Sequence, residues 1–154
     1  MKSKSFIGRQ KELNLLESLY LSKKFEMLIL HGRRRVGKSY LLSHFANLHS
    51  KNVVYFTGDK SSEKNNVKNF CEELNKVLAA GDFIKSFTTW NDVYSFLKNA
   101  EIKERLVLII DEFTYLYNSN PAYDSVLQNA IDKILKLKNI FLILCGSAVS
   151  VIEE

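Results

Sequence analysis

Residues 32–39 read Gly32-Arg33-Arg34-Arg35-Val36-Gly37-Lys38-Ser39 and match the pattern G-x-x-x-x-G-K-[ST] at every fixed position. The two glycines let the backbone curl so that its amide groups point at a phosphate. A helical pattern follows, and the positive N-terminal end of a helix attracts the same anion. We predict that Lys38 reaches the β- and γ-phosphates of a nucleotide and that the Ser39 hydroxyl ligates Mg²⁺. We include Tyr40, the next residue, in this phosphate-binding segment.

The flanking residues predict the arrangement that such a loop requires. Residues 25–30 form a short apolar run typical of a buried strand, and residues 38–49 have helical spacing. Further strands are predicted at 52–57, 105–110 and 140–145, and further helices at 9–22, 65–80 and 89–99. Another helix is predicted after Asn120 as its cap and Pro121 as its first residue, with apolar positions continuing to Ile134.

Short apolar strands that alternate with helices indicate a parallel sheet covered on both faces. The predicted class is therefore α/β, as a three-layer P-loop NTPase sandwich, and residues 1–154 are expected to form one domain or part of one. The cysteines, Cys71 and Cys145, are too few and too far apart for a disulfide or zinc framework, so we expect two buried thiols.

An acidic pair follows the third predicted strand. The segment 106–112 is five apolar residues and then Asp111-Glu112. Because side chains alternate along an extended strand, the two carboxylates are expected to point in different directions and to have separate roles. We predict that Asp111 holds Mg²⁺, directly or through water, and that Glu112 orients and polarises the attacking water.

The fourth predicted strand ends in Gly146-Ser147. A small polar residue at this point would lie near the γ-phosphate, between the strand that precedes the loop and the strand that ends in Asp111. We predict that Ser147 contacts the γ-phosphate; an ordinary turn serine is the alternative.

Composition and charge limit the other possibilities. The chain has 154 residues, 46% of them hydrophobic and 25% charged, as in globular domains. Its longest apolar runs have five or six residues, whereas a membrane span needs about 20, so we expect a cytoplasmic protein without a membrane segment. Residues 1–60 carry 12 Lys and Arg against 4 Asp and Glu, while residues 61–154 carry 10 against 13. This basic third, which includes Arg33, Arg34 and Arg35, indicates a nucleic-acid surface, a phosphate site or plain solvated charge.

The four motifs together resemble a known family. Phe6-Ile7-Gly8-Arg9-Gln10-Lys11-Glu12-Leu13 looks like the F-x-G-R-x-x-E-L signature that opens many AAA+ and STAND-type ATPases. With the loop at 32–39, Asp111-Glu112 and Gly146-Ser147, the chain is similar to the archaeal-type ATPases, found in archaea and bacteria. This resemblance implies the strand order 5-1-4-3-2, ATP and Mg²⁺ as ligands, and adenine lodged near Phe6, Ile7 and Gly8.

The resemblance also implies segments that this sequence does not contain. Members of the family continue into a fifth strand, a helical lid with a sensor arginine and often another domain. We therefore expect residues 1–154 to be the N-terminal part of the ATPase domain, with the strand before the loop as a bare sheet edge through which copies could associate. Without the lid's arginine we expect slow hydrolysis.

Other functions are compatible with parts of the pattern. A GTPase is disfavoured because no N-K-x-D segment is present; Asn75-Lys76 continues with Val77-Leu78. A small-metabolite kinase fits the loop, but the pair Asp111-Glu112 suits water activation better. A nucleotide-gated binding module with little hydrolysis, and a nucleic-acid-binding adaptor that uses the basic third, remain as alternatives.

Overall fold

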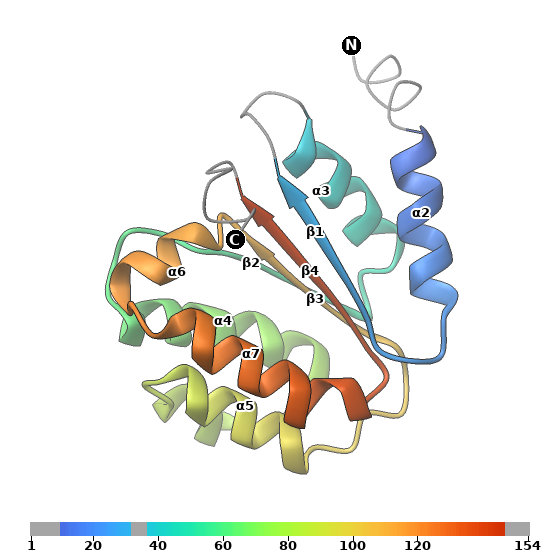
Figure 1. The fold of residues 1–154 in the computed structure, drawn as a ribbon. Coiled ribbons are helices and arrows are strands. Elements are labelled where there is room, and N and C mark those ends of the chain that lie inside the picture. Colours follow the sequence, from blue (N-terminus) through green and yellow to red (C-terminus); the bar gives the residue numbers. More distant parts are fainter. Residues whose placement is uncertain (1–9, 32–36, 147–154) are drawn as a thin grey trace.

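The computed structural model of the chain describes residues 10–31 and 37–146, which form a parallel β-sheet between two layers of helices (Figure 1). The four strands of the described sheet have the order β1-β4-β3-β2, and all neighbours are parallel. This order agrees with the predicted order 5-1-4-3-2 for the four strands that it includes. The α/β class is confirmed.

The strands are β1 (Glu26–His31), β2 (Val53–Thr57), β3 (Leu106–Asp111) and β4 (Ile140–Gly146). The helices are α2 (Gln10–Leu21), α3 (Lys38–Leu48), α4 (Glu63–Leu78), α5 (Trp90–Asn99), α6 (Thr114–Ser119) and α7 (Tyr123–Lys133), with 3-10 turns η1 (Asp82–Ser86) and η2 (Leu135–Leu137). Each predicted strand and long helix is present within a few residues of its expected bounds. The short elements α6, η1 and η2 were not predicted.

The sheet separates two hydrophobic cores, because successive side chains of each strand point to opposite faces. On one face Val107, Ile109 and Phe141 pack with α2 and α3. On the other face Leu108, Ile110 and the alternate residues of β4 pack with α4, α5, α6 and α7. Figure 1 shows these two groups of helices on opposite sides of the sheet. The continuous apolar character of β3 and β4 follows from this, because both faces of each strand are buried.

The segment before α7 differs from the prediction. Asn120 and Pro121 were expected to start this helix, but α7 begins at Tyr123 with Ala122 as its N-cap residue. The Asn120 side chain instead accepts a hydrogen bond from the Ala122 amide (3.0 Å) and donates one to Glu63 (2.7 Å). Asn120 therefore closes the turn between α6 and α7 and ties it to α4, a contact that local spacing could not reveal. The helix ends at Lys133, so Ile134 lies just beyond it.

The strand that precedes the loop lies at an edge. Within the described sheet β1 pairs with β4 alone. Met27 and Ile29 are 41% and 39% exposed, so the prediction of a buried strand at 25–30 is wrong for one of its faces. The other face, with Leu28 and Leu30, packs against the core formed with α2 and α3.

Candidate functional site

The predicted phosphate-binding lysine and serine lie in the first turn of α3, the next described element after β1. Gly37 precedes them with φ 83° and ψ 16°, a left-handed conformation that glycine adopts without steric cost. The first turn of α3 contains no acidic residue, and no side chain caps it. The first amides of a helix have no partner within the helix, and an N-terminus without an acidic residue or a side-chain cap suits an anion. Tyr40 lies in the same turn.

Asp111 ends β3 and its side chain is buried, with 5% exposed. Its Oδ2 atom accepts a hydrogen bond of 2.9 Å from the Ser39 hydroxyl and another of 2.8 Å from the Tyr55 hydroxyl. Its Oδ1 atom accepts one of 2.9 Å from the Glu112 amide. The structure thus brings together Ser39 and Asp111, the two residues predicted as metal ligands, at the carboxyl edge of the sheet.

Glu112 lies outside the strand. Its φ is 53°, a left-handed conformation that is unusual for a residue with a side chain. Asp111 is the last residue of β3 and Glu112 lies in the turn after it, so the expectation that they diverge through strand alternation gave the wrong reason. Strained backbone at such a point is typical of functional sites, where neighbouring contacts hold it in place.

Two neighbouring strands hold this turn. The Gly58 amide, just after β2, donates to the Asp111 carbonyl (2.8 Å), and the Phe113 amide donates to the Cys145 carbonyl of β4 (3.1 Å). A β-carbon at Gly58 would lie 2.9 Å from the Glu112 carbonyl oxygen, closer than van der Waals contact allows. A side chain at this position would force one of the two backbones to shift, so glycine allows the close approach of the segment after β2 to Glu112.

Burial changes the chemistry of two side chains beside Asp111. It raises the pKa of Tyr55, and the negative charge of Asp111 raises it further, so the phenol stays a hydrogen-bond donor at neutral pH. Burial and then the charge of Asp111 raise the pKa of the Cys145 thiol to about 12. Cys145 and Cys71 are both free and buried, as predicted. Neither Tyr55 nor Gly58 was predicted as a site residue; their only signal was their place at the end of the second predicted strand.

Several predicted site residues lie outside the described residues. They are the loop residues Gly32, Arg33, Arg34, Arg35 and Val36, the predicted γ-phosphate contact Ser147, and the predicted adenine contacts Phe6, Ile7 and Gly8. Among the residues that are described, Lys38, Ser39, Asp111 and Glu112 all come from the ends of elements at the carboxyl edge of the sheet. Their proposed roles stay predictions.

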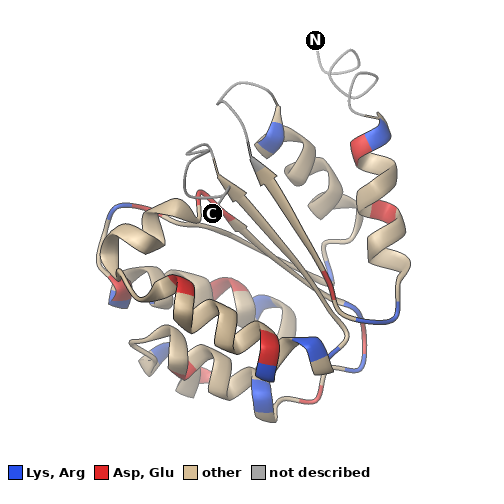
Figure 2. Cartoon of the chain, viewed as in Figure 1, with Lys and Arg blue, Asp and Glu red and all other residues tan. Residues whose placement is uncertain are grey.

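The structure describes only part of the basic third, residues 1–60. Six of its 12 Lys and Arg residues fall within 1–9 and 32–36, which the structure does not describe. Of the other six, Lys11 and Lys38 lie in helices, whereas Lys23, Lys24, Lys51 and Lys60 lie in the connections between elements. Figure 2 shows Lys and Arg positions both on helices and in loops.

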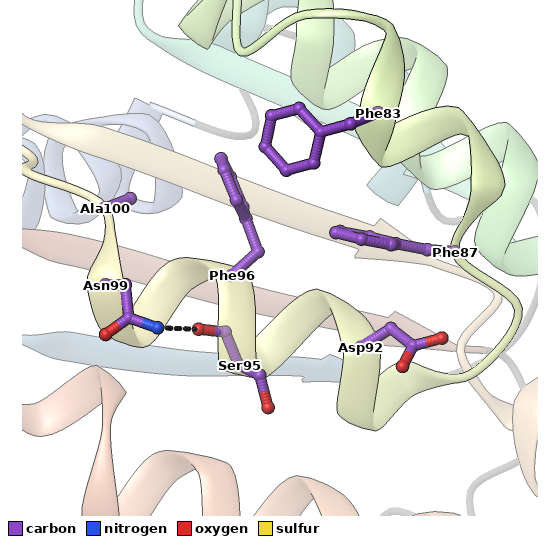
Figure 3. A pocket seen from close by; sticks show the side chains of 7 residues that line it. All are labelled: Phe83, Phe87, Asp92, Ser95, Phe96, Asn99 and Ala100. Atoms are coloured by element: carbon purple, nitrogen blue, oxygen red, sulfur yellow. Dashed lines mark hydrogen bonds between the residues drawn. The ribbon is translucent and has the colours of Figure 1, made fainter.

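A hollow of about 490 Å³ lies between η1 and α5. Its apolar walls are Phe83, Phe87 and Phe96, whose ring centroids lie 5.7–6.2 Å apart, and Figure 3 shows Asp92 beside Phe87. The Asp92 carboxylate caps α5, because it accepts hydrogen bonds from the amides of Thr88 and Thr89. None of the residues that line this hollow belongs to the predicted nucleotide site.

Within residues 10–31 and 37–146, no helix has the length and apolar character needed to cross a membrane. The same residues contain no group of three or more His, Cys, Asp or Glu side chains arranged to hold a metal ion. A cation bound beside Asp111 would therefore need further ligands from the nucleotide or from water.

The parallel sheet of order β1-β4-β3-β2, with a G-x-x-x-x-G-K-S sequence between its edge strand and a helix, defines an α/β P-loop NTPase. Residues 6–154 match a family profile described as an ATPase domain predominantly from Archaea. The chain belongs to this family, as the resemblance in its motifs predicted.

Relatives and solved structures agree with this assignment. Protein MJECL04 of Methanocaldococcus jannaschii is 31% identical over 149 residues, which cover 97% of this chain and 31% of MJECL04. The ORC2 protein of Aeropyrum pernix, solved in ADPNP-ADP complexes, superposes with a TM-score of 0.65 at 16% identity, over 94% of this chain and 42% of ORC2. Drosophila ORC bound to DNA gives a TM-score of 0.60 at 12% identity, over 94% of this chain and 38% of that one. The two structures show likeness of fold alone, and this chain spans less than half of each of these proteins.

Proposed function

We propose that this chain binds ATP together with Mg²⁺ and hydrolyses the γ-phosphate bond, and that turnover changes its contacts with a partner. The observation that supports this most directly is the hydrogen bond of 2.9 Å from Ser39 to Asp111. It joins the end of the phosphate-binding motif to the end of the acidic strand. ATP hydrolysis with Mg²⁺ requires both of these parts of a site. Membership in an ATPase family supports the same function.

The described residues suit a magnesium ion. Mg²⁺ prefers oxygen ligands and is usually held by one or two carboxylates, water and phosphate oxygens. Ser39 and Asp111 supply a hydroxyl and a buried carboxylate whose oxygens are oriented by three hydrogen bonds. When bound, the ion would offset negative charge on the phosphates. The amides of Gly32 to Gly37 and the Lys38 ammonium would hold the phosphates, and Phe6, Ile7 and Gly8 would contact the adenine.

The water-activating role is assigned to Glu112. Its backbone amide is bound to Asp111 and its carbonyl oxygen lies close to Gly58, so its main chain is held from both sides. A carboxylate on a fixed backbone can accept a proton from a water molecule as that water attacks the γ-phosphate. The Lys38 ammonium would stabilise the charge that develops on the departing phosphates, and Ser147 would contact the γ-phosphate.

Calorimetric titration with ATP in the presence of Mg²⁺ tests the proposal. The wild-type chain should bind ATP, and Lys38→Ala should lose this binding while keeping the circular dichroism of the folded chain. Lys68→Ala, which removes an exposed lysine from α4, is the matched control and should bind as the wild type does. Equal affinity of Lys38→Ala and Lys68→Ala would contradict the assignment of the phosphate site.

Nucleic acid is the second candidate partner, and the excess of Lys and Arg in residues 1–60 favours it. Drosophila ORC, which shares the fold, has been solved bound to DNA. Binding driven by the release of counterions weakens steeply as salt is raised. Titration of labelled duplex and single-stranded DNA at two salt concentrations tests this partner, and the absence of binding at low salt would exclude it.

A further inference from the structure

Tyr55 reaches the candidate metal site from a neighbouring strand. In the pairing of β2 with β3, Tyr55 lies beside Ile109 and Thr57 lies beside Asp111. Two residues along a strand span about 6.6 Å, and the long tyrosine side chain bridges this distance. Its hydroxyl donates a hydrogen bond of 2.8 Å to Oδ2 of Asp111. The contact therefore depends on the hydroxyl at the tip of the ring, which phenylalanine lacks.

Three hydrogen bonds to the Asp111 carboxylate come from three different parts of the fold. Ser39 belongs to α3, Tyr55 to β2, and the Glu112 amide to the turn after β3. The Ser39 hydroxyl and the Glu112 backbone belong to the predicted reaction site, so ligand binding can change their geometry. Of these three donors, Tyr55 is the one that belongs to a strand, and its ring packs against the core on the face covered by α2 and α3. It can hold the carboxylate in one orientation whether or not ligands are present.

We infer that Tyr55 is a positioning residue, which orients the Asp111 carboxylate for Mg²⁺ and thereby sets the affinity of the site for the metal rather than for the nucleotide. This inference rests on the proposed function. Residues that orient a metal ligand through a hydrogen bond commonly change metal affinity by 10–100-fold when they are removed. Tyr55 makes no contact of its own with the metal in this proposal and acts only through Asp111.

Tyr55→Phe tests the inference because it removes the hydroxyl and keeps the ring. We expect the Mg²⁺ concentration that gives half-maximal ATP binding to rise about tenfold, while ATP affinity in EDTA stays unchanged. The matched control is Tyr20→Phe, which removes a phenol that accepts a hydrogen bond of 2.8 Å from Asn52 before the start of β2. This control should leave the Mg²⁺ dependence as in the wild type, although both variants lose a tyrosine hydroxyl.

A double variant separates positioning from general stability. In an Asp111→Ala background, Tyr55→Phe should not change the Mg²⁺ dependence further, because Tyr55 acts through the missing carboxylate. If Tyr55→Phe does not fold, 4-fluorophenylalanine at position 55 fills the volume of the hydroxyl with an atom that cannot donate a hydrogen bond. The same tenfold shift is then expected.

The outcomes distinguish this inference from the function on which it rests. A wild-type chain that binds ATP equally well with and without Mg²⁺ would overturn the proposed metal-dependent function. A wild-type chain with clear Mg²⁺ dependence, together with an unchanged dependence in Tyr55→Phe, would overturn the role of Tyr55 alone. Equal shifts in Tyr55→Phe and Tyr20→Phe would also overturn it, because the effect would then come from lost stability.

Discussion

The hydroxyl of Ser39 lies 2.9 Å from Oδ2 of Asp111 and donates a hydrogen bond to it, although 72 residues separate the two along the chain. Ser39 stands in the first turn of α3, the next described element after β1, and Asp111 is the last residue of β3. Because β1 and β3 are parallel and flank β4, their carboxyl ends lie at the same edge of the sheet. The fold therefore assembles a hydroxyl and a carboxylate where the phosphate-binding motif ends.

Removing the carboxylate should weaken the metal-dependent part of nucleotide binding. Asp111→Ala is expected to lower ATP affinity by roughly tenfold or more in excess Mg²⁺ and to change it little in EDTA, because only the metal loses a ligand. Calorimetry in the two buffers measures both values. Asp111→Asn, which keeps the shape and removes the charge, should show the same pattern. A loss of affinity of equal size in EDTA would point to disruption of the fold instead.

Glu112→Gln should separate binding from hydrolysis. The amide fills the same space but cannot take a proton from water, so turnover is expected to fall by about 10²–10⁴-fold while ATP affinity is kept. Phosphate release and calorimetry measure the two quantities. Glu101→Gln, a change at an exposed glutamate before β3, serves as the control. If Glu112→Gln hydrolyses ATP at the wild-type rate, another residue activates the water.

Gly58→Ala should lower the free energy of unfolding and should also displace the backbone of Glu112. The added methyl group would lie 2.9 Å from the Glu112 carbonyl oxygen, so the backbone of one strand end must move. Such overpacking costs about 1–3 kcal/mol, which urea unfolding monitored by circular dichroism would detect. Thr57→Ala changes the exposed neighbouring residue and should have a smaller effect. An unchanged midpoint in Gly58→Ala would show that the site relaxes easily.

Stability should fall in alkaline solution, partly through Cys71. Burial, followed by the charge of Asp92, raises the pKa of this thiol from 9.0 to about 11 in the folded chain. Between these two values the unfolded chain loses the thiol proton and the folded chain keeps it, so deprotonation favours unfolding. We expect Cys71 to contribute no pH dependence to the urea midpoint near neutral pH and to lower it as the pH rises from 9.0 toward 11. In Cys71→Ala this decline should be shallower, and an equal decline in both chains would contradict the assignment.

The exposed face of β1 should promote association of the chain with itself. Met27 and Ile29 are 41% and 39% exposed on a strand with one neighbour in the described sheet, and bare apolar edges pair with other strands. Ile29→Lys should reduce the association seen by sedimentation velocity at increasing concentration. Leu137→Lys, at a residue of η2 that is 82% exposed, is the control for a general loss of surface hydrophobicity. Equal effects of the two changes would exclude a specific role for the edge.

Much of the fold follows from local patterns. The four apolar runs predicted the strands because each is buried on one or both faces, and their alternation with helices predicted a parallel sheet. Lys38, Ser39 and Asp111 could be proposed as site residues because each occupies a defined position at the end of a recognisable element, and their roles stay predictions. The helix start at Asn120 was predicted wrongly, because this side chain contacts Glu63, which lies 57 residues away in the chain.

By itself, the sequence determined the elements, the α/β class and the phosphate-binding motif, since these depend on the spacing of residues that are close along the chain. Only the tertiary structure decided that Tyr55 donates to Asp111, that Gly58 lies against the Glu112 carbonyl, and that Glu112 takes a left-handed conformation. These features depend on strand register and on the close approach of separate segments. The pairing of Tyr55 with Ile109 in adjacent strands is one such register, and no spacing within either strand encodes it.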